Sequence, residues 1–134
     1  MRQAYYRYQI VSKMGSSLGR VLEIGAGYGM LCAALMARDC PEQYVIVDLP
    51  ENMILEWFYL GAIFGERVSL VIREADLVRL RTDGIVILAP WLLPAFAALG
   101  RPVQLGINTM SFQHMTLTNV AYYLRWLEAL QAQH

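Results

Sequence analysis

The sequence predicts an α/β domain with a mostly parallel sheet and flanking helices. Short β-branched and apolar runs alternate with helical patterns along the chain, which is typical of parallel α/β architecture. A glycine cluster separates the first apolar run from the helical pattern that follows it. The chain has 134 residues, of which 57% are hydrophobic, and this is enough for one packed core. We therefore treat residues 1–134 as a single domain.

The first predicted elements are a helix, a strand and a second helix. Residues 3–14 have a helical pattern that ends at the break Gly15-Ser16-Ser17. Residues 20–24 form a short β-branched and apolar run that leads into the glycine cluster, which predicts a strand. Residues 30–38 predict a helix that ends at Asp39-Cys40-Pro41.

The next two elements are a strand and an apolar helix. The run 44–47 predicts a strand that ends at Asp48. Pro50 begins a helix that ends near Gly65, since proline is favoured in the first turn of a helix. Its expected inner face consists of Leu55, Phe58, Tyr59 and Ala62.

The second half of the chain predicts three further strands and two helices. Apolar residues alternate over 68–72, which indicates a strand or an arm of a hairpin. Residues 85–89 and 103–107 predict buried strands, the first of them followed by a turn and an apolar helix. Residues 116–130 predict a closing helix. Its expected inner side consists of Val120, Tyr123, Leu124 and Leu127.

Composition excludes several classes of partner. The 11 basic and 11 acidic residues balance, so we expect no nucleic-acid partner. The uncharged stretch from Gly84 to Gly100 is shorter than the roughly 20 apolar residues of a membrane helix and contains two prolines, so we expect no membrane span. Cys32 and Cys40 lack metal-ligand spacing, so we expect no metal site. Either they form a disulfide or, as we favour, they are buried thiols in a cytoplasmic protein.

A glycine-rich turn contains the first candidate ligand-binding residues. The segment from Glu23 to Gly29 reads EIGAGYG and lies between a strand and a helix. Glycine lets the backbone approach a ligand closely, because a Cβ would block it. Dinucleotide motifs have the spacing G-x-G-x-x-G and hold a pyrophosphate. Here the spacing is G-x-G-x-G, and Glu23 would repel a pyrophosphate but attract an ammonium or sulfonium group. Alternatively, Glu23 is an ordinary acid at the end of a strand.

Asp48 is the second candidate, 25 positions after Glu23. A carboxylate at the end of the second strand lies beside the glycine turn in this topology, where it can accept two hydrogen bonds from a ribose diol. The other interpretation is that Asp48 caps the helix that begins at Pro50. The glycine turn upstream favours ribose binding.

These segments resemble a known enzyme family. VLEIGAGYG, followed by YVIVDLPEN, resembles motif I and the acidic strand of class I S-adenosylmethionine-dependent methyltransferases. IVDLPENMILEWFYLGAIFGE and INTMSFQHMT, followed by a helix with YYL, are similar to the sugar O-methyltransferases. The resemblance runs from about Tyr5 to Leu130. It implies a Rossmann-like methyltransferase sheet and S-adenosylmethionine as cofactor.

The resemblance also implies particular site residues. Leu49 would lie near the adenine, and Asn108 would end the fourth core strand and face the transferred methyl group. The full set expected to bind the cofactor is Glu23, Gly25, Ala26, Gly27, Tyr28, Asp48, Leu49 and Asn108.

The chain departs from the family at its C-terminal end. A class I domain continues with further strands after the helix that ends near Leu130. The resemblance therefore implies a sheet that lacks the C-terminal strands of the full domain, as in a fragment or a reduced version. An exposed sheet edge needs a cover, and a second copy of the chain would supply it.

His114 is the candidate catalytic base. A sugar hydroxyl loses its proton during methyl transfer, and histidine is a common general base near neutral pH. The other interpretation is that His114 caps or packs against the closing helix, and the family commonly has Glu at this position. Asn108 and Ser111 either orient the acceptor or build the turn after the strand.

Three other features have a functional and a structural interpretation. Asp76 resembles the acid that binds the adenine amine in many methyltransferases, where a core strand precedes it. In this chain the later strand over 85–89 fits the place of that core strand better. We therefore expect Asp76 in an inserted hairpin or loop. Trp91 follows a strand end and could stack on the adenine. Three tyrosines either roof the cofactor pocket or pack the first helix: Tyr5, Tyr6 and Tyr8.

Three functions from different classes fit the sequence. The first is an active methyltransferase that acts on a hydroxyl of a sugar, a glycan or a similar small acceptor. The second is a cofactor-binding module that is catalytically incomplete and needs a partner chain. The third is a nicotinamide-dependent oxidoreductase, which the glycine spacing and Glu23 disfavour.

Overall fold

A computed structural model of the chain describes residues 2–15 and 17–130. In this part, five strands form one parallel sheet in the order β3-β4-β2-β1-β5, which confirms the predicted α/β class and is consistent with a Rossmann-like fold. The strands are β1 (Arg20–Ile24), β2 (Gln43–Val47), β3 (Val68–Val71), β4 (Gly84–Leu88) and β5 (Leu105–Ile107). Ser16, in the expected break after the first helix, lies outside the described residues.

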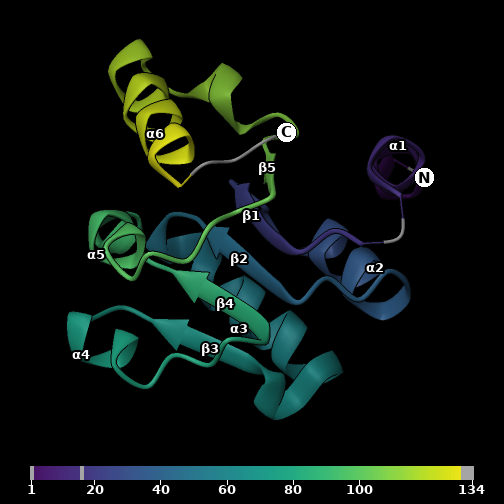
Figure 1. Cartoon of the computed structure of the whole chain (residues 1–134), viewed down its shortest axis with the longest axis horizontal. Coiled ribbons are helices and arrows are strands. Elements are labelled where there is room, and N and C mark those ends of the chain that lie inside the picture. The colour runs from purple at the N-terminus through teal and green to yellow at the C-terminus, as the bar shows by residue number, and fades with distance from the viewer. Residues whose placement is uncertain (1, 16, 131–134) are drawn as a thin grey trace.

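Helices cover both faces of the sheet. The α-helices are α1 (Arg2–Met14), α2 (Met30–Arg38), α3 (Pro50–Phe64), α4 (Glu74–Leu77), α5 (Leu93–Ala97) and α6 (Leu117–Ala129). The 3-10 turns are η1 (Gly65–Arg67), η2 (Pro90–Leu92) and η3 (Ser111–His114). Right-handed crossovers put α2 and α3 on one face and α4 and α5 on the other. Figure 1 shows α1 beside α2 and α6 on the side of α5.

The core lies between these layers. Every residue of β2 and β4 is buried, because both strands have neighbours on each side and helices on both faces. In the register of the sheet, Glu23 of β1 lies opposite Ile46 of β2 and Ile107 of β5. The carboxyl ends of the strands, and the loops that follow them, therefore meet at one edge of the sheet.

The structure shows how residues 68–71 and the uncharged stretch from Gly84 to Gly100 fold. Val68–Val71 pairs in parallel with β4, so it is a strand at the sheet edge and not an arm of a hairpin. The uncharged stretch folds as β4, η2 and α5. Among residues 2–15 and 17–130, no helix has the length and hydropathy to cross a membrane.

Helix α3 differs most from the sequence expectation. The residues predicted to face inward are exposed, and Phe58 has 77% of its surface exposed. The buried residues of α3 are Met53, Glu56 and Leu60. Because the helix is apolar almost all round, periodicity alone cannot select its inner face, and a charged residue is normally assigned to the outside.

Smaller corrections concern α6 and the cysteines. Leu124, expected on the inner side of α6, is 51% exposed, whereas Tyr123 is buried as predicted. The Tyr122 hydroxyl donates a hydrogen bond to the carbonyl of Pro90 at 3.1 Å, which fixes the rotation of the helix. Cys32 is buried, but Cys40 is exposed, so only one of the two thiols follows the expectation.

Candidate ligand-binding site

The glycine turn follows β1, which is the strand from which the sheet extends in both directions. Strand β1 has β2 on one side and β5 on the other, and the connections that lead to these two strands run over opposite faces. In open α/β sheets, ligands bind at the carboxyl ends of the strands beside such a strand. The topology therefore makes the loop after β1 the primary candidate site.

The three glycines of the turn have different neighbours. All three have positive φ angles, which are 73° at Gly25, 64° at Gly27 and 76° at Gly29. A Cβ at Gly25 would overlap the side chain of Ser111, and one at Gly29 would lie 2.9 Å from Cδ1 of Leu60. A Cβ at Gly27 would meet nothing within 4 Å. Gly25 and Gly29 thus serve close packing, whereas Gly27 faces open space.

Asp48 is joined directly to the glycine turn. Its Oδ2 accepts a hydrogen bond from the Gly27 backbone N–H at 3.1 Å. Its Oδ1 accepts two more, from the Leu49 N–H at 2.7 Å and from Nδ2 of Asn52 at 2.9 Å. The structure therefore brings Asp48 and Gly27 together, as the sequence predicts. Oδ2 accepts one N–H donor among the described residues, so it can accept a further hydrogen bond from a hydroxyl or a protonated carboxyl group.

Glu23 lies beneath the turn. Only 1% of its surface is exposed, and its Oε2 accepts a hydrogen bond from the Tyr44 hydroxyl at 2.7 Å. Burial raises the pKa of Glu23 to about 7; the hydrogen bond from Tyr44 opposes the rise and the nearby charge of Asp48 adds to it. Glu23 is thus a buried carboxyl close to Asp48, and its contact with a cofactor stays a prediction.

Glu56 is a site residue that the sequence reasoning missed. It lies on the inner face of α3 with 0% of its surface exposed. No N–H or hydroxyl group in the described part of the chain donates to its carboxyl oxygens. Burial raises the pKa of Glu56 to about 9, and a side-chain hydrogen bond with Asp48 and the charges of Asp48 and Glu23 add to the rise. Its one visible signal in the sequence is that it stands alone as an acid within the apolar run of α3.

No basic side chain pairs with these three carboxyl groups within residues 2–15 and 17–130. The ion pairs found there are Arg7–Asp39, Arg73–Asp76 and Arg81–Asp83. In the same residues, no group of three His, Cys, Asp or Glu side chains is arranged to hold a metal ion. Glu23, Asp48 and Glu56, which we call the carboxyl group cluster, therefore concentrate acidic groups without a neutralising partner.

The loop after β5 closes the other side of the turn. Nδ2 of Asn108 donates to the Ile24 carbonyl at 3.1 Å and also contacts Oγ of Ser111. The Ser111 hydroxyl donates to the same carbonyl at 2.8 Å. Oδ1 of Asn108 accepts a hydrogen bond from the Phe112 N–H at 3.3 Å. Both side chains thus build the turn after the strand, which is one of their two predicted roles, and they fasten it to the end of β1.

The remaining predicted residues lie around the turn or apart from it. Ala26 is partly buried in the turn, and Tyr28 and Leu49 are exposed beside it. His114 ends η3, is exposed, and its Nε2 lies 3.1 Å from Nε2 of Gln113. No hydrogen bond between His114 and the glycine turn occurs in the described residues, so its role as a base stays a prediction.

Asp76 and Trp91 have structural partners. Strand β4, and not β3, pairs with β2, so the strand over 84–88 takes the expected place in the sheet. Asp76 itself was expected in an inserted hairpin or loop, but it lies in the short helix α4 between the parallel strands β3 and β4. Its carboxylate accepts hydrogen bonds from the N–H groups of Ile72 and Arg73 at the start of α4. Nε1 of Trp91 lies 3.4 Å from the Ile72 carbonyl, and the ring is largely exposed.

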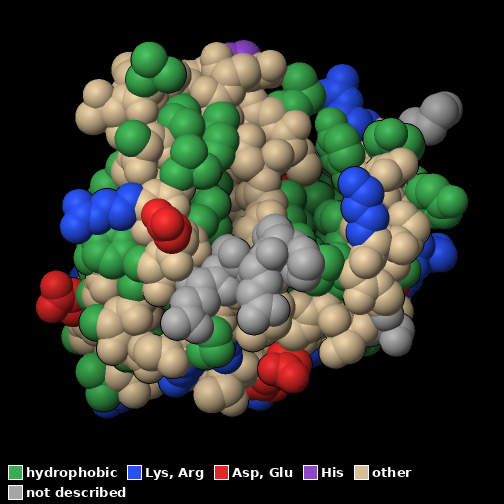
Figure 2. Space-filling view, turned by 45° about the horizontal axis from the view of Figure 1, so that its top comes forward, with side chains coloured by type: hydrophobic (Ala, Val, Ile, Leu, Met, Phe, Trp, Pro, Cys, Tyr) green, Lys and Arg blue, Asp and Glu red, His purple; other side chains and the backbone are tan. Residues whose placement is uncertain are grey.

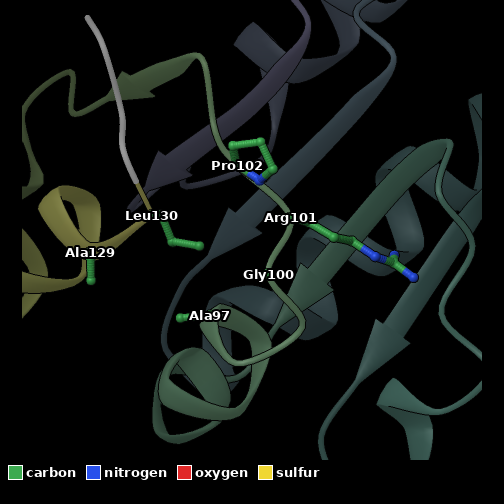
Figure 3. A pocket seen from close by; sticks show the side chains of 6 residues that line it. All are labelled: Ala97, Gly100, Arg101, Pro102, Ala129 and Leu130. Atoms are coloured by element: carbon green, nitrogen blue, oxygen red, sulfur yellow. The ribbon is translucent and has the colours of Figure 1, made fainter.

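Two hollows differ in their distance from the turn. One, of about 250 Å³, lies between α1 and β5 and includes Asn108. It is lined by Tyr6, Gln9, Ile10, Leu105, Gly106, Ile107, Asn108 and Thr109. The other, of about 270 Å³, lies at the start of β5, and Figure 3 shows Arg101 pointing away from Ala129 and Leu130 there. Because strands start at the opposite edge from the glycine turn, we assign no ligand to this second hollow.

On the face shown in Figure 2, basic and acidic side chains are scattered among hydrophobic ones. Comparison of the chain with known protein families, curated proteins and solved structures finds no match.

Proposed function

We propose that the glycine turn and the carboxyl group cluster bind S-adenosylmethionine, and that the protein is a methyltransferase for a hydroxyl of a sugar or similar small acceptor. The observation that supports this most is the cluster of Glu23, Asp48 and Glu56 beside the turn, which has no basic ion-pair partner among the described residues. Buried carboxylates repel a pyrophosphate and attract a sulfonium or ammonium group. This disfavours a nicotinamide dinucleotide at the same place.

The residues present fit such a cofactor. Gly27 leaves open space above the turn, where a Cβ would otherwise project. A ribose hydroxyl can take the remaining acceptor position on Oδ2 of Asp48 in place of the Glu56 carboxyl group, and a small movement of Asn52 would open a second for a ribose diol. Tyr28 and Leu49 expose apolar surface on which an adenine ring can pack. Cys32 and Cys40 are free thiols, which suits the reducing conditions of the cytoplasm.

The chain must also position the acceptor. When bound, S-adenosylmethionine supplies a methyl group on a positively charged sulfur. The hollow between α1 and β5 reaches Asn108 and offers the polar side chains of Tyr6 and Gln9, so we place the acceptor there. Holding a hydroxyl oxygen in line with the methyl group is the main contribution to rate. His114, at the end of the turn that covers Gly25, is the proposed acceptor of the hydroxyl proton.

Calorimetric titration of the purified chain tests the cofactor. We expect S-adenosylmethionine and S-adenosylhomocysteine to bind with micromolar affinity and NADH not to bind. Asp48→Ala should weaken binding at least tenfold, because it removes the acceptor for the ribose and the contact with Gly27. Asp83→Ala, an acid of the surface pair with Arg81, is the matched control and should bind as the wild type does.

Two results would change the assignment. A folded protein that binds neither methyl cofactor, or that binds NADH instead, contradicts the proposal. If the cofactor binds but no sugar acceptor is methylated in a panel assay, the chain is a binding module that needs a partner.

A further inference from the structure

Glu56 is buried in a way that packing does not explain. It lies on the inner face of α3 between the apolar residues Met53 and Leu60, fully shielded from solvent. No N–H or hydroxyl group in the part of the chain that the structure describes donates to its oxygens, and its hydrogen-bonding neighbour is the carboxyl group of Asp48. A buried carboxyl group whose partner is another carboxyl group is unfavourable, and an apolar side chain of similar size avoids this cost. The position is therefore unfavourable for stability and calls for another role.

The groups that face Glu56 are mostly acidic. Strand β1 contributes Glu23, the end of β2 is followed by Asp48, and the first turn of α2 contributes Cys32. Tyr44 of β2 donates its hydroxyl to Glu23 and not to Glu56. Within residues 2–15 and 17–130, no Lys or Arg forms an ion pair with any of the carboxyl groups. Negative charge at Glu56 would therefore add to that of its neighbours without compensation.

Asp48 and Glu56 differ sharply in their donors. Three neutral donors stabilise the charge of Asp48, namely two backbone N–H groups and the amide of Asn52. Among the described residues no N–H or hydroxyl donates to Glu56, and its burial beside Asp48 and Glu23 favours the protonated form of its carboxyl group. The raised pKa of Glu56, about 9, agrees with this assignment. In the protein without ligand, Glu56 is thus a neutral acid at neutral pH.

A positive charge placed beside the carboxyl group cluster opposes the protonated form of Glu56, because it stabilises the ionised carboxyl group. S-adenosylmethionine has a sulfonium charge, and the product S-adenosylhomocysteine does not. We propose that Glu56 releases its proton to solvent when a cationic cofactor binds, so that the site holds the charged cofactor more tightly than the neutral product. This inference rests on the proposed function, since it needs the cofactor to bind at the glycine turn.

Proton release can be counted by calorimetry in buffers that differ in ionisation enthalpy. We would titrate the wild type and Glu56→Gln with S-adenosylmethionine and with S-adenosylhomocysteine at pH 8. This pH lies above the pKa of Glu23, about 7, and below that of Glu56, about 9. The wild type should release most of one proton per bound S-adenosylmethionine and much less with S-adenosylhomocysteine. Glu56→Gln should lose this release and lower the affinity ratio of the two ligands.

Two controls separate Glu56 from other sources of protons. The ligand amine exchanges protons equally in both proteins, so the difference between wild type and variant removes it. Glu66→Gln changes an exposed acid just after α3 and should leave the release unchanged. In the wild type, the infrared band of a protonated carboxyl should also disappear when S-adenosylmethionine binds, and this measurement needs no variant.

The outcomes distinguish this inference from the proposed function. Binding of S-adenosylmethionine without proton release and without loss of the infrared band overturns the role of Glu56 and leaves the cofactor assignment intact. The same holds if Glu56→Gln releases as much as the wild type. If neither ligand binds to the folded wild type, both proposals fail.

Discussion

The glycine turn is held from two sides that differ in how their polar groups are satisfied. On the β5 side, Asn108 and Ser111 are neutral, and both donate to the Ile24 carbonyl. On the β2 side, Asp48 has three N–H donors, whereas Glu56 has no N–H or hydroxyl donor among the described residues. The same residues place no basic side chain in an ion pair with these carboxyl groups. The β5 side therefore holds the turn in place, and the β2 side is the one that we propose to contact the cofactor.

The largest expected effect is a dependence of stability on pH that comes from the β2 side. Unfolded glutamate has a pKa of about 4.3. Glu23 and Glu56 have pKa values of about 7 and about 9 in the folded chain, so the folded chain binds more protons between these limits. Their contribution to stability is complete below pH 4 and is lost as pH rises through 7 and then 9, with a slope of at most about 1.4 kcal/mol per pH unit for each group.

Urea unfolding from pH 5 to 9 measures this slope. Glu56→Met should remove one of the two contributions to the slope between pH 5 and 7 and the remaining slope between pH 7 and 9, and it should raise the free energy of unfolding at pH 8 by at least about 2 kcal/mol. Glu66→Met, at an exposed position, should stay within about 0.5 kcal/mol of the wild type. Stability that rises with pH in this range would show that the two acids are ionised in the folded chain.

Gly25→Ala should have the next largest effect and acts on the β5 side. The new Cβ would overlap Ser111, and the φ of 73° is unfavourable for alanine. Strain and overpacking together should lower the free energy of unfolding by about 3 kcal/mol. Gly27→Ala has the same backbone strain but open space around the Cβ, so it should lose only about 1 kcal/mol. Equal losses in the two variants, measured by chemical unfolding, would argue against close packing by the β5 loop.

Ser111→Ala should have the smallest effect. It removes one hydrogen bond to the Ile24 carbonyl, while the bond from Asn108 remains. We expect a loss of about 1 kcal/mol in the free energy of unfolding, with unchanged affinity for S-adenosylmethionine. A large loss of affinity in this variant, measured by calorimetry, would remove the distinction between the two sides.

The sequence predicts one side of the turn better than the other. The proximity of Asp48 and Gly27 was predictable, because the strand order of a parallel α/β sheet places the ends of β1 and β2 together. Glu56 was not, since α3 is apolar all round and its orientation depends on what packs against it. Likewise, the choice between two roles for Asn108 depended on a carbonyl 84 residues away in the chain. Strands and local motifs follow from sequence, whereas helix rotation and long-range hydrogen bonds follow from the tertiary structure.

The pairing of β1 with β5 also sets an order of events during synthesis. The partner of Glu23 in β5 is Ile107, far along the chain, whereas β2 follows β1 after a short helix. Contacts between distant residues form slowly, because a long loop must close first. During synthesis Asp48 leaves the ribosome before Ser111, so Asp48 can reach the glycine turn before the loop after β5 closes over it. The packing around the turn is therefore completed late, when β5 docks beside β1.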